Sequence, residues 1–291
     1  MKKKYITLIL SLVLILGYFA TSRLQVSSTP SLLLNSPPTS SYKALVTTST
    51  LQTTTSTSTT QLDQTKIDWW LVRSKNHNAP GFNDKLKFKL SDYSALCLGD
   101  TSRKVVYLTF DEGYENGYTP QILDVLKAND VKAMFFVTLP YMKQNEGLIK
   151  RMEEEGHLVC NHSNHHRSMP TLVADETQFN KELTDVSEAY TQITGKEMPP
   201  FFRPPMGHYS EKSLALTKAM GYQTVFWSFA YCDWKPDAQP EPAGAKKLML
   251  DGLHNGAIYL LHAVSKTNTN ILGDFIKETK QMGYTFELLP Y

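Results

Sequence analysis

The chain has 291 residues, of which 41% are hydrophobic and 20% charged, so its composition is that of an ordinary globular protein. The length suffices for one large domain or two small ones, and a net charge of +2 argues against a dedicated nucleic-acid binder. The three cysteines, Cys97, Cys160 and Cys232, are far apart and include no CxxC pair. We therefore expect buried thiols in place of a disulfide framework or a cysteine-based zinc site, with one disulfide left open if the compartment is oxidising.

The N-terminus carries a targeting segment. Three lysines at positions 2–4 precede an unbroken apolar run from Tyr5 to Ala20. The run is short for a transmembrane helix but fits the core of a signal sequence. Because no clean A-x-A cleavage site precedes Ala20, residues 1–20 are predicted to be a retained signal anchor in preference to a cleaved signal peptide. In either case we expect the remainder to be exported and to act outside the cytoplasm.

Two segments separate this leader from the regular part of the chain. Residues 21–66 are rich in Ser, Thr and Pro. Such a segment buries too little apolar surface to offset its ordering entropy, so it is predicted to be a flexible linker. Residues 67–103 contain aromatic side chains but little periodicity, with a turn signal at 78–81. They are predicted to form an extension packed on the main domain.

From residue 104 to residue 291, apolar β-rich runs alternate with helical patterns. Strands are expected at 105–110, 131–137, 157–160, 224–229, 257–261 and 285–289, and helices at 119–126, 145–155, 174–194, 211–220 and 270–282. This alternation predicts parallel βαβ units and hence an α/β sheet or barrel. Polar clusters repeatedly follow the strands, so one rim of a single barrel would collect them all.

The first polar cluster is the acidic pair Asp111 and Glu112, directly after the buried run 105–110. Burying such charges is costly unless a metal, a substrate or a partner compensates them. The alternative is an acidic turn that simply ends a strand. His162 and His166, four residues apart after the third strand, offer two imidazoles to the same point. With a carboxylate from the acidic pair they would form a site typical of catalytic zinc and other divalent ions, and the alternative is a His-rich surface loop.

Three further clusters follow in order. Arg203 lies in a rigid Pro-rich context and can hold a carboxylate ionised, although an ordinary surface ion pair is the alternative. Asp233 can orient a histidine and Trp234 can wall a small pocket, unless that indole is simply core. His262 ends an apolar strand and has the intrinsic pKa of a general acid at neutral pH, unless it is a satisfied core histidine.

The order of these motifs resembles the polysaccharide deacetylase family, the NodB-homology carbohydrate esterases of family 4. The matching stretches are Thr109–Gly113 (TFDEG), His162–His166 (HSNHH), Arg203–Gly207 (RPPMG), the pair 233–234 and Leu260–His262 (LLH). The resemblance covers residues 104–291 and implies an α/β fold, the distorted (β/α) barrel of that family.

A closer resemblance concerns the delta-lactam-biosynthetic de-N-acetylases of endospore-forming bacteria. It rests on residues 98–101, 109–120, 221–228 and 256–262, and extends to 70–80. It implies removal of the N-acetyl group of muramic acid in peptidoglycan, a step toward the muramic delta-lactam of the spore cortex. The implied partners are peptidoglycan glycan strands and, through the N-terminal segment, the membrane. We expect a monomer at the cell wall or forespore surface.

The family mechanism also implies a role for each matching residue. It implies that Asp111 is the general base and that Arg203 keeps Asp111 ionised. It implies that His262 is the acid that protonates the departing amine and that Asp233 sets the charge of His262. The implied ligands of a divalent metal are His162, His166 and Glu112. Zinc is the expected ion, with cobalt or manganese as alternatives. Trp234 and Leu260 would line the pocket for the acetyl methyl group, Pro205 and Tyr114 would contact substrate, and the backbone N–H near Tyr114 would bind the oxyanion.

Two positions depart from the family pattern. Glu112 stands where the family has a second aspartate, and Met206 replaces the usual Tyr or Arg. Two other functions remain open at this point. The first is a deacetylase of N-acetylglucosamine in peptidoglycan or chitin-like glycans, and the second is an inactive module that binds wall glycans.

Overall fold

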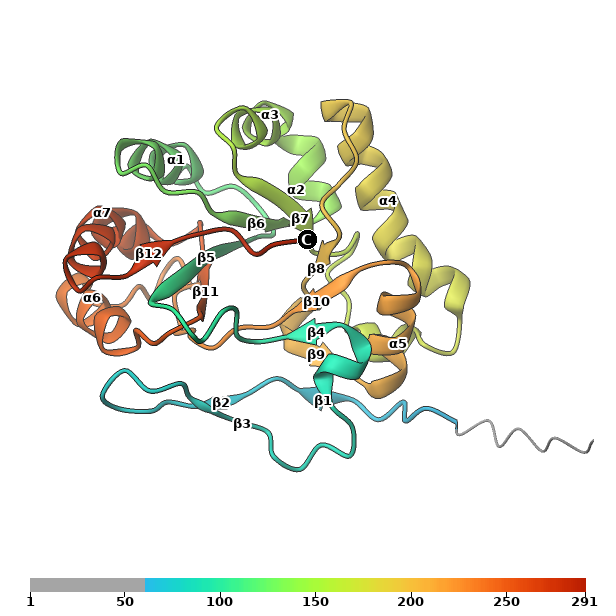
Figure 1. Cartoon of the computed structure of the whole chain (residues 1–291). Helices are drawn as coiled ribbons and strands as arrows, with labels where there is room; N and C mark the ends of the chain where they lie inside the picture. The colour runs from blue at the N-terminus through green and yellow to red at the C-terminus, as the bar shows by residue number, and fades with distance from the viewer. Residues whose placement is uncertain (1–60) are drawn as a thin grey trace, which may run out of the picture. The chain divides into compact units, whose positions relative to one another are not determined.

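The computed structural model describes residues 61–291 (Figure 1). The predicted anchor, residues 1–20, and nearly all of the predicted linker, residues 21–66, lie outside this range. Within residues 61–291, no helix has the length and apolar character that crossing a membrane requires.

A parallel sheet forms the centre of the molecule and confirms the predicted α/β class. Its strands follow the order β11 (Ala257–His262), β5 (Val105–Glu112), β6 (Met134–Val137), β7 (Leu158–Asn161), β8 (Phe201–Phe202), β10 (Gln223–Val225) and β4 (Ala95–Leu96), and β12 (Thr285–Phe286) pairs with the start of β5. The chain after β10 returns to the other edge, where Phe229 forms a bridge with Tyr259 of β11. The sheet therefore closes into a distorted barrel.

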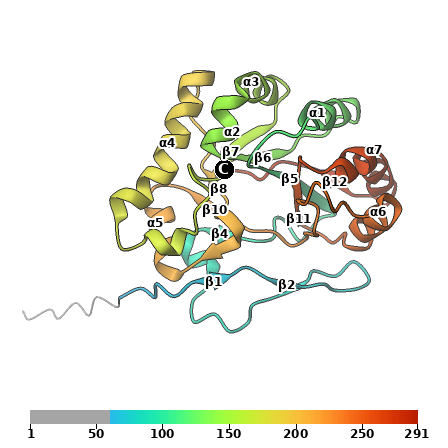
Figure 2. The same cartoon turned by 180° about the vertical axis from the view of Figure 1, so that it is seen from behind.

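Within the described residues, seven α-helices pack around this barrel on the sides that the N-terminal strands leave free (Figures 1 and 2). They are α1 (Thr119–Ala128), α2 (Leu139–Gln144), α3 (Glu146–Glu154), α4 (Glu176–Thr194), α5 (Glu211–Ala219), α6 (Pro242–Asp251) and α7 (Lys266–Gln281). α4 starts after the capping side chain of Asp175 and ends at Gly195, whose φ of 72° suits a glycine cap. Five of the helices were predicted, whereas the six-residue α2 and the Pro-flanked α6 were not.

Side-chain alternation along β5 determines what the site can contain. Val106, Leu108 and Phe110 pack in the core between sheet and helices, whereas Val105 and Tyr107 pack inside the barrel. Because the strand continues to its eighth residue, Glu112, the alternation continues as well. It turns Asp111 toward the barrel interior and Glu112 toward the helices.

The N-terminal extension does more than cover the barrel. Its strands β1 (Ile67–Asp68), β2 (Leu71–Val72) and β3 (Gly81–Phe82) lie outside the main sheet, with β1 paired to β9 (His208–Tyr209). Trp69 stacks on Phe226 with ring centroids 4.4 Å apart and anchors this layer. β4, however, is hydrogen-bonded to β10 within the sheet. The predicted boundary between residues 103 and 104 therefore separates a strand from its own barrel.

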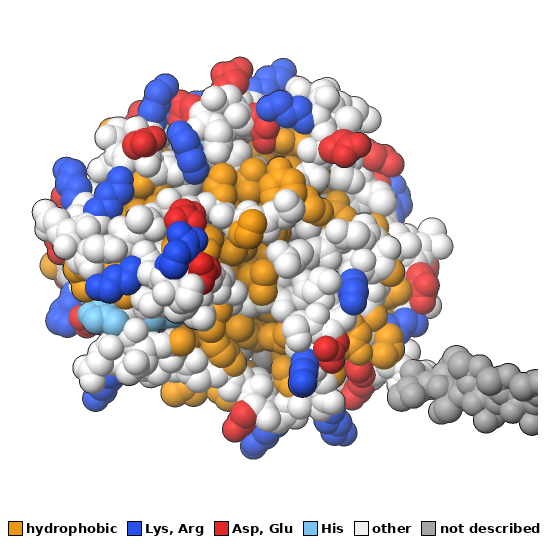
Figure 3. Space-filling view, in the orientation of Figure 1, with side chains coloured by type: hydrophobic (Ala, Val, Ile, Leu, Met, Phe, Trp, Pro, Cys, Tyr) orange, Lys and Arg blue, Asp and Glu red, His pale blue; other side chains and the backbone are white. Residues whose placement is uncertain are grey.

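The end of the chain closes the barrel at the amino-terminal ends of its strands. Leu289 is buried in the same inner cluster as Val105 and Phe201, and the ring of Tyr291 packs edge-on against Phe201. Figure 3 shows hydrophobic side chains gathered on the middle of this face, around the chain end marked in Figure 1. These C-terminal residues do not cover the opposite rim, at the carboxyl ends of the strands.

The cysteines are all free. Cys160 lies buried in β7, as expected, whereas Cys97 is half-buried and Cys232 is exposed. The expectation of buried thiols therefore holds fully for Cys160 alone.

Candidate active site at the carboxyl rim of the barrel

Asp111 and His262 lie side by side where their strands end. β5 and β11 pair in parallel, with Leu260 opposite Thr109 and His262 opposite Asp111. Residues two apart on a strand share a face, so all four side chains belong to the inner face of the sheet. The register alone thus brings a carboxylate and an imidazole together at the rim where α/β barrels carry their active sites.

Arg203 holds Asp111 from inside the barrel. It is fully buried, and its Nη1 donates to Asp111 Oδ1 at 2.7 Å and to Thr109 Oγ1 at 2.8 Å. The guanidinium also lies 4.1 Å over the ring of Phe136. Burial alone would raise the pKa of Asp111, but the positive charge of Arg203 holds that pKa below its usual value. Asp111 is therefore an ionised base.

The two predicted histidines lie next to this base. The rings of His162 and His166 meet edge to face with centroids 4.9 Å apart. His162 Nδ1 donates to the carbonyl of Arg203 at 2.8 Å, which leaves the lone pair on Nε2, 3.5 Å from Asp111 Oδ2. Burial lowers the pKa of His162 to about 4, so its ring is neutral. His166 is exposed at the mouth of the site.

A buried carboxylate on α4 fixes the loop that carries these histidines. Glu182 accepts hydrogen bonds from the backbone N–H and from Nδ1 of His165, both at 2.8 Å. Ser163 and His166 have φ values of 70° and 54°, and Ser163 Oγ accepts from the N–H of His166 at 3.0 Å. The backbone at these two positions is thus left-handed, a conformation that residues other than glycine seldom adopt and that is common at functional sites. The sequence pattern did not indicate Glu182, because its partner lies in another element.

Asp233 holds His262 in place through two hydrogen bonds. Its Oδ1 accepts from His262 Nδ1 at 2.7 Å and its Oδ2 accepts from the His262 backbone N–H at 2.8 Å. Burial alone would lower the pKa of His262, but the hydrogen bond and charge of Asp233, together with the charge of Asp111, outweigh burial and raise it. His262 therefore retains its proton at a higher pH than a free histidine and can act as an acid.

The predicted substrate-contacting residues surround this acid–base pair to different extents. Trp234 is 48% exposed and its ring centroid lies 5.7 Å from that of His262, while Leu260 is buried on the same strand face as His262. Tyr114 is 48% exposed just beyond β5, and Pro205 is buried in a turn two residues after Arg203. Of these four residues, Trp234 and Leu260 therefore lie next to His262.

Glu112 does not join the histidines, contrary to the prediction that it is the third metal ligand. It is fully buried on the helix side of β5, where its Oε1 lies 3.5 Å from Thr119 Oγ1 and its Oε2 has no hydrogen-bond partner. Burial, followed by the charges of Glu115 and Asp111, raises the pKa of Glu112 well above its usual value. The physical reason is the strand alternation described above, which sends neighbouring side chains to opposite faces.

The remaining donor set still suits a divalent ion in part. Within residues 61–291 no group of three or more His, Cys, Asp and Glu side chains is arranged to hold a metal. His162 nevertheless presents a bare nitrogen beside His166 and the Asp111 carboxylate, and neutral imidazoles are common ligands of zinc. The fit is therefore with the two histidines and not with Glu112.

We expect the substitution Glu112→Gln to leave acetate release and the bound-metal content within about twofold of the unmodified protein. Glutamine is isosteric, and the buried carboxyl makes no contact with the rim. Acetate assays and metal analysis of the purified variant check this, with Thr119→Val as a control in the same contact. If the variant lost both its metal and its activity, Glu112 would be a metal ligand after all.

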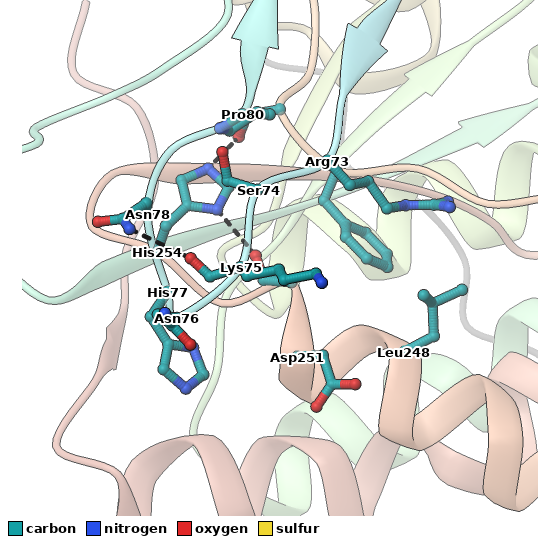
Figure 4. A pocket seen from close by; sticks show the side chains of 13 residues that line it. Arg73, Ser74, Lys75, Asn76, His77, Asn78, Pro80, Leu248, Asp251 and His254 are labelled. Carbon is teal, nitrogen blue, oxygen red and sulfur yellow. Dashed lines mark hydrogen bonds between the residues drawn. The ribbon is translucent and has the colours of Figure 1, made fainter.

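A hollow lies away from this site. It has a volume of about 670 Å³ and separates the loop before β3 from the end of α6. Figure 4 shows Arg73 and Lys75 from the loop facing Leu248 and Asp251 from α6. None of the rim residues described above lines it. This hollow is therefore separate from the site at the rim.

An arginine-held base and an aspartate-held acid on adjacent strands define a hydrolase site in an α/β barrel. The polysaccharide deacetylase family model matches residues 98–225. The chain is 48% identical over 221 residues to the peptidoglycan-N-acetylmuramic acid deacetylase PdaA of Bacillus subtilis, covering 76% of this chain and 83% of that protein. The chain thus belongs to the polysaccharide deacetylase family, whose members hydrolyse amide-linked acetyl groups and are generally metal-dependent.

A solved structure of this relative and one further relative add to the comparison. The structure of Bacillus subtilis PdaA, a family 4 carbohydrate esterase, superimposes with a TM-score of 0.75 at 46% identity and covers 78% of this chain and 96% of that chain. The peptidoglycan-N-acetylglucosamine deacetylase PgdA of Listeria monocytogenes is 37% identical over 188 residues, which are 64% of this chain and 38% of that protein. The fold agrees with the predicted distorted barrel.

Proposed function

We propose that this protein removes the N-acetyl group from N-acetylmuramic acid in peptidoglycan. The observation that carries the proposal is the 48% identity, over 83% of its length, to a Bacillus subtilis protein named for that activity. The likeness to delta-lactam-biosynthetic enzymes adds that the product leads to the muramic delta-lactam of the spore cortex. We also propose that residues 1–20 anchor the chain to the membrane, outside the cytoplasm, and that it acts as a monomer on glycan strands.

His162 and His166 are the proposed ligands of the metal, which we expect to be zinc, with cobalt or manganese as alternatives. When bound there, the ion would polarise the acetamide carbonyl and acidify the attacking water. The protein holds the His162 ring for this task through its hydrogen bond to the Arg203 carbonyl.

Proton transfers fall to the residues of the rim. Asp111, kept ionised by Arg203, takes a proton from the water that attacks the acetyl carbon. His262, kept protonated by Asp233, gives a proton to the amine as the carbon–nitrogen bond breaks. The products are acetate and the free amino sugar, and general acid–base catalysis of this kind contributes about 10²–10⁴-fold in rate. Trp234 and Leu260, beside His262, are proposed to receive the acetyl methyl group.

Two other functions compete with this one. The Listeria relative supports activity on N-acetylglucosamine, though at lower identity. An inactive glycan-binding module would need no paired base and acid, yet Asp111, Arg203, Asp233 and His262 are all present and in contact in their pairs. Retention of both pairs favours catalysis.

The test of substrate is acetate release from two substrates offered in parallel with zinc, cobalt or manganese. One is glycan strands whose muramic residues have lost their peptides, and the other is chito-oligosaccharides. We expect release from the muramoyl strands alone. Preference for chito-oligosaccharides would replace the muramic assignment by the glucosamine one, and no release with any metal would favour the binding module.

We expect kcat/KM to fall at alkaline pH as His262 loses its proton. Because Asp233 and Asp111 raise the pKa of His262, this loss should occur above the ordinary histidine value of about 6.5. Replacing Asp233 with asparagine removes the nearest negative charge, so the pKa of His262 should fall and the alkaline decline should move to lower pH. A pH profile of deacetylation checks this, with Asp237→Asn, an exposed position of the same loop, as control. An unmoved decline would assign it to another group.

A further inference from the structure

A buried amide lies beneath the Asp233–His262 pair. Asn268, in the first turn of α7, is 1% exposed. Its Nδ2 donates to Asp233 Oδ2 at 2.6 Å and approaches the His262 carbonyl at 3.2 Å. Asp233 is itself fully buried, so each hydrogen bond to its carboxylate matters for keeping the charge there. Among residues 61–291, Asn268 is therefore the one side chain besides His262 that donates a hydrogen bond to the Asp233 carboxylate, and it shares Oδ2 with the His262 backbone N–H.

Tyr231 determines which way this amide points. Its hydroxyl donates to Asn268 Oδ1, and Tyr231 is buried at the base of the loop that carries Asp233. With the amide oxygen engaged by a donor, only the NH₂ group can face the carboxylate. A flipped amide would place oxygen against the negative charge of Asp233. The chain Tyr231–Asn268–Asp233–His262 is thus directional, with every proton accounted for.

The helix itself does not need this amide. Ser265 caps α7 by accepting from the Asn268 backbone N–H at 3.0 Å, a contact that any residue can supply. The side chain of Asn268 makes its contacts with Tyr231, Asp233 and the His262 carbonyl, all of which belong to the acid side of the site. The amide is therefore directed to the active site and not to the secondary structure.

We propose that Asn268, oriented by Tyr231, is a positioning residue that fixes Asp233 and thereby aims the proton of His262 at the departing amine. This inference rests on the proposed role of His262 as general acid. It predicts that Asn268 matters in proportion to how much the leaving group needs a proton. An amine must be protonated to leave, whereas a nitrophenolate leaves without a proton.

The test compares two substrates for each variant of the full chain. One is the N-acetylated glycan and the other is 4-nitrophenyl acetate. Asn268→Leu is expected to lower kcat for the glycan at least tenfold with KM within about twofold, while hydrolysis of the ester falls less than threefold. Tyr231→Phe should show the same selectivity to a smaller degree. In the double variant Tyr231→Phe should add no further loss, because the amide it orients is gone.

Controls separate positioning from general damage. Thr269→Val, the next position of the same helix turn, removes a hydroxyl that contacts only the Ser265 carbonyl and should leave both rates unchanged. Equal loss on glycan and ester in both Asn268→Leu and Tyr231→Phe would overturn the proposal in favour of a structural role. His262→Ala tests the underlying assignment separately: if it also lowers both rates equally, His262 is not the acid, and the proposal fails with it.

Discussion

Replacing Asp111 with asparagine is expected to lower acetate release about 10²–10⁴-fold, the usual contribution of a general base. The amide keeps the shape of the side chain but cannot take a proton. Its oxygen can still accept from Arg203, whose Nη1 lies 2.7 Å from the Asp111 carboxylate, so the fold should survive. Acetate release from glycan strands and the circular dichroism of the variant measure the two effects.

The matched control is Asp274→Asn, at an exposed position of α7. It makes the same chemical change without touching the rim and should retain full activity. If Asp111→Asn were as active as this control, the base would have to be another group, and the arrangement of Asp111 with Arg203 would be structural.

Arg203→Met should cause the largest loss of stability among the rim substitutions, about 3–5 kcal/mol, because it leaves a buried carboxylate without its partner. The pH dependence has a definite sign. The pKa of Asp111 is lower in the folded protein than in the unfolded chain, so the ionised carboxylate stabilises the fold at any pH above the unfolded-chain pKa. This stabilisation is lost as the pH falls through the pKa of Asp111 in the folded protein. Without Arg203 the pKa should rise, so the deficit should be greatest at neutral pH and shrink toward pH 4. Urea unfolding at several pH values measures this.

Two further variants check the cause. Adding Asp111→Asn to Arg203→Met removes the stranded charge and should recover part of the lost stability. Arg151→Met breaks partly exposed ion pairs with Asp124 and Glu155 and should cost about 1 kcal/mol or less. A loss of equal size in Arg151→Met and Arg203→Met would show that burial of the Asp111 pair is not the source of the effect.

The position of Asp111 and His262 at one rim could be predicted from the sequence, because apolar patterns mark the strands that carry them. The runs before Asp111 and His262 indicated two buried strands, and adjacency in a parallel sheet did the rest. The prediction that Glu112 lies beside the two histidines was wrong because of the same strand geometry. The predicted strand ended at residue 110, which left both acids in a turn, whereas β5 continues through Glu112 and imposes its alternation.

The supporting residues were beyond the reach of sequence patterns. The predicted last helix began at residue 270, but α7 begins at Lys266, so Asn268 fell in a presumed loop. Glu182 was one of many polar residues in the predicted helix 174–194, although its side chain is only 3% exposed and contacts His165. Both act on partners far away in sequence, and a contact of that kind leaves no periodic trace.

The pairing of β5 with β11 bears on how such an enzyme can change. Asp111, the proposed proton acceptor, and His262, the proposed proton donor, occupy paired positions of two hydrogen-bonded strands, so their spacing does not depend on loop conformation. Loops that follow the strands and carry none of the residues holding this pair (Arg203, Tyr231 and Asp233) can therefore be lengthened or exchanged while Asp111 and His262 keep their spacing. Selectivity for a different sugar is thus open to loop grafting without rebuilding the machinery for breaking the amide.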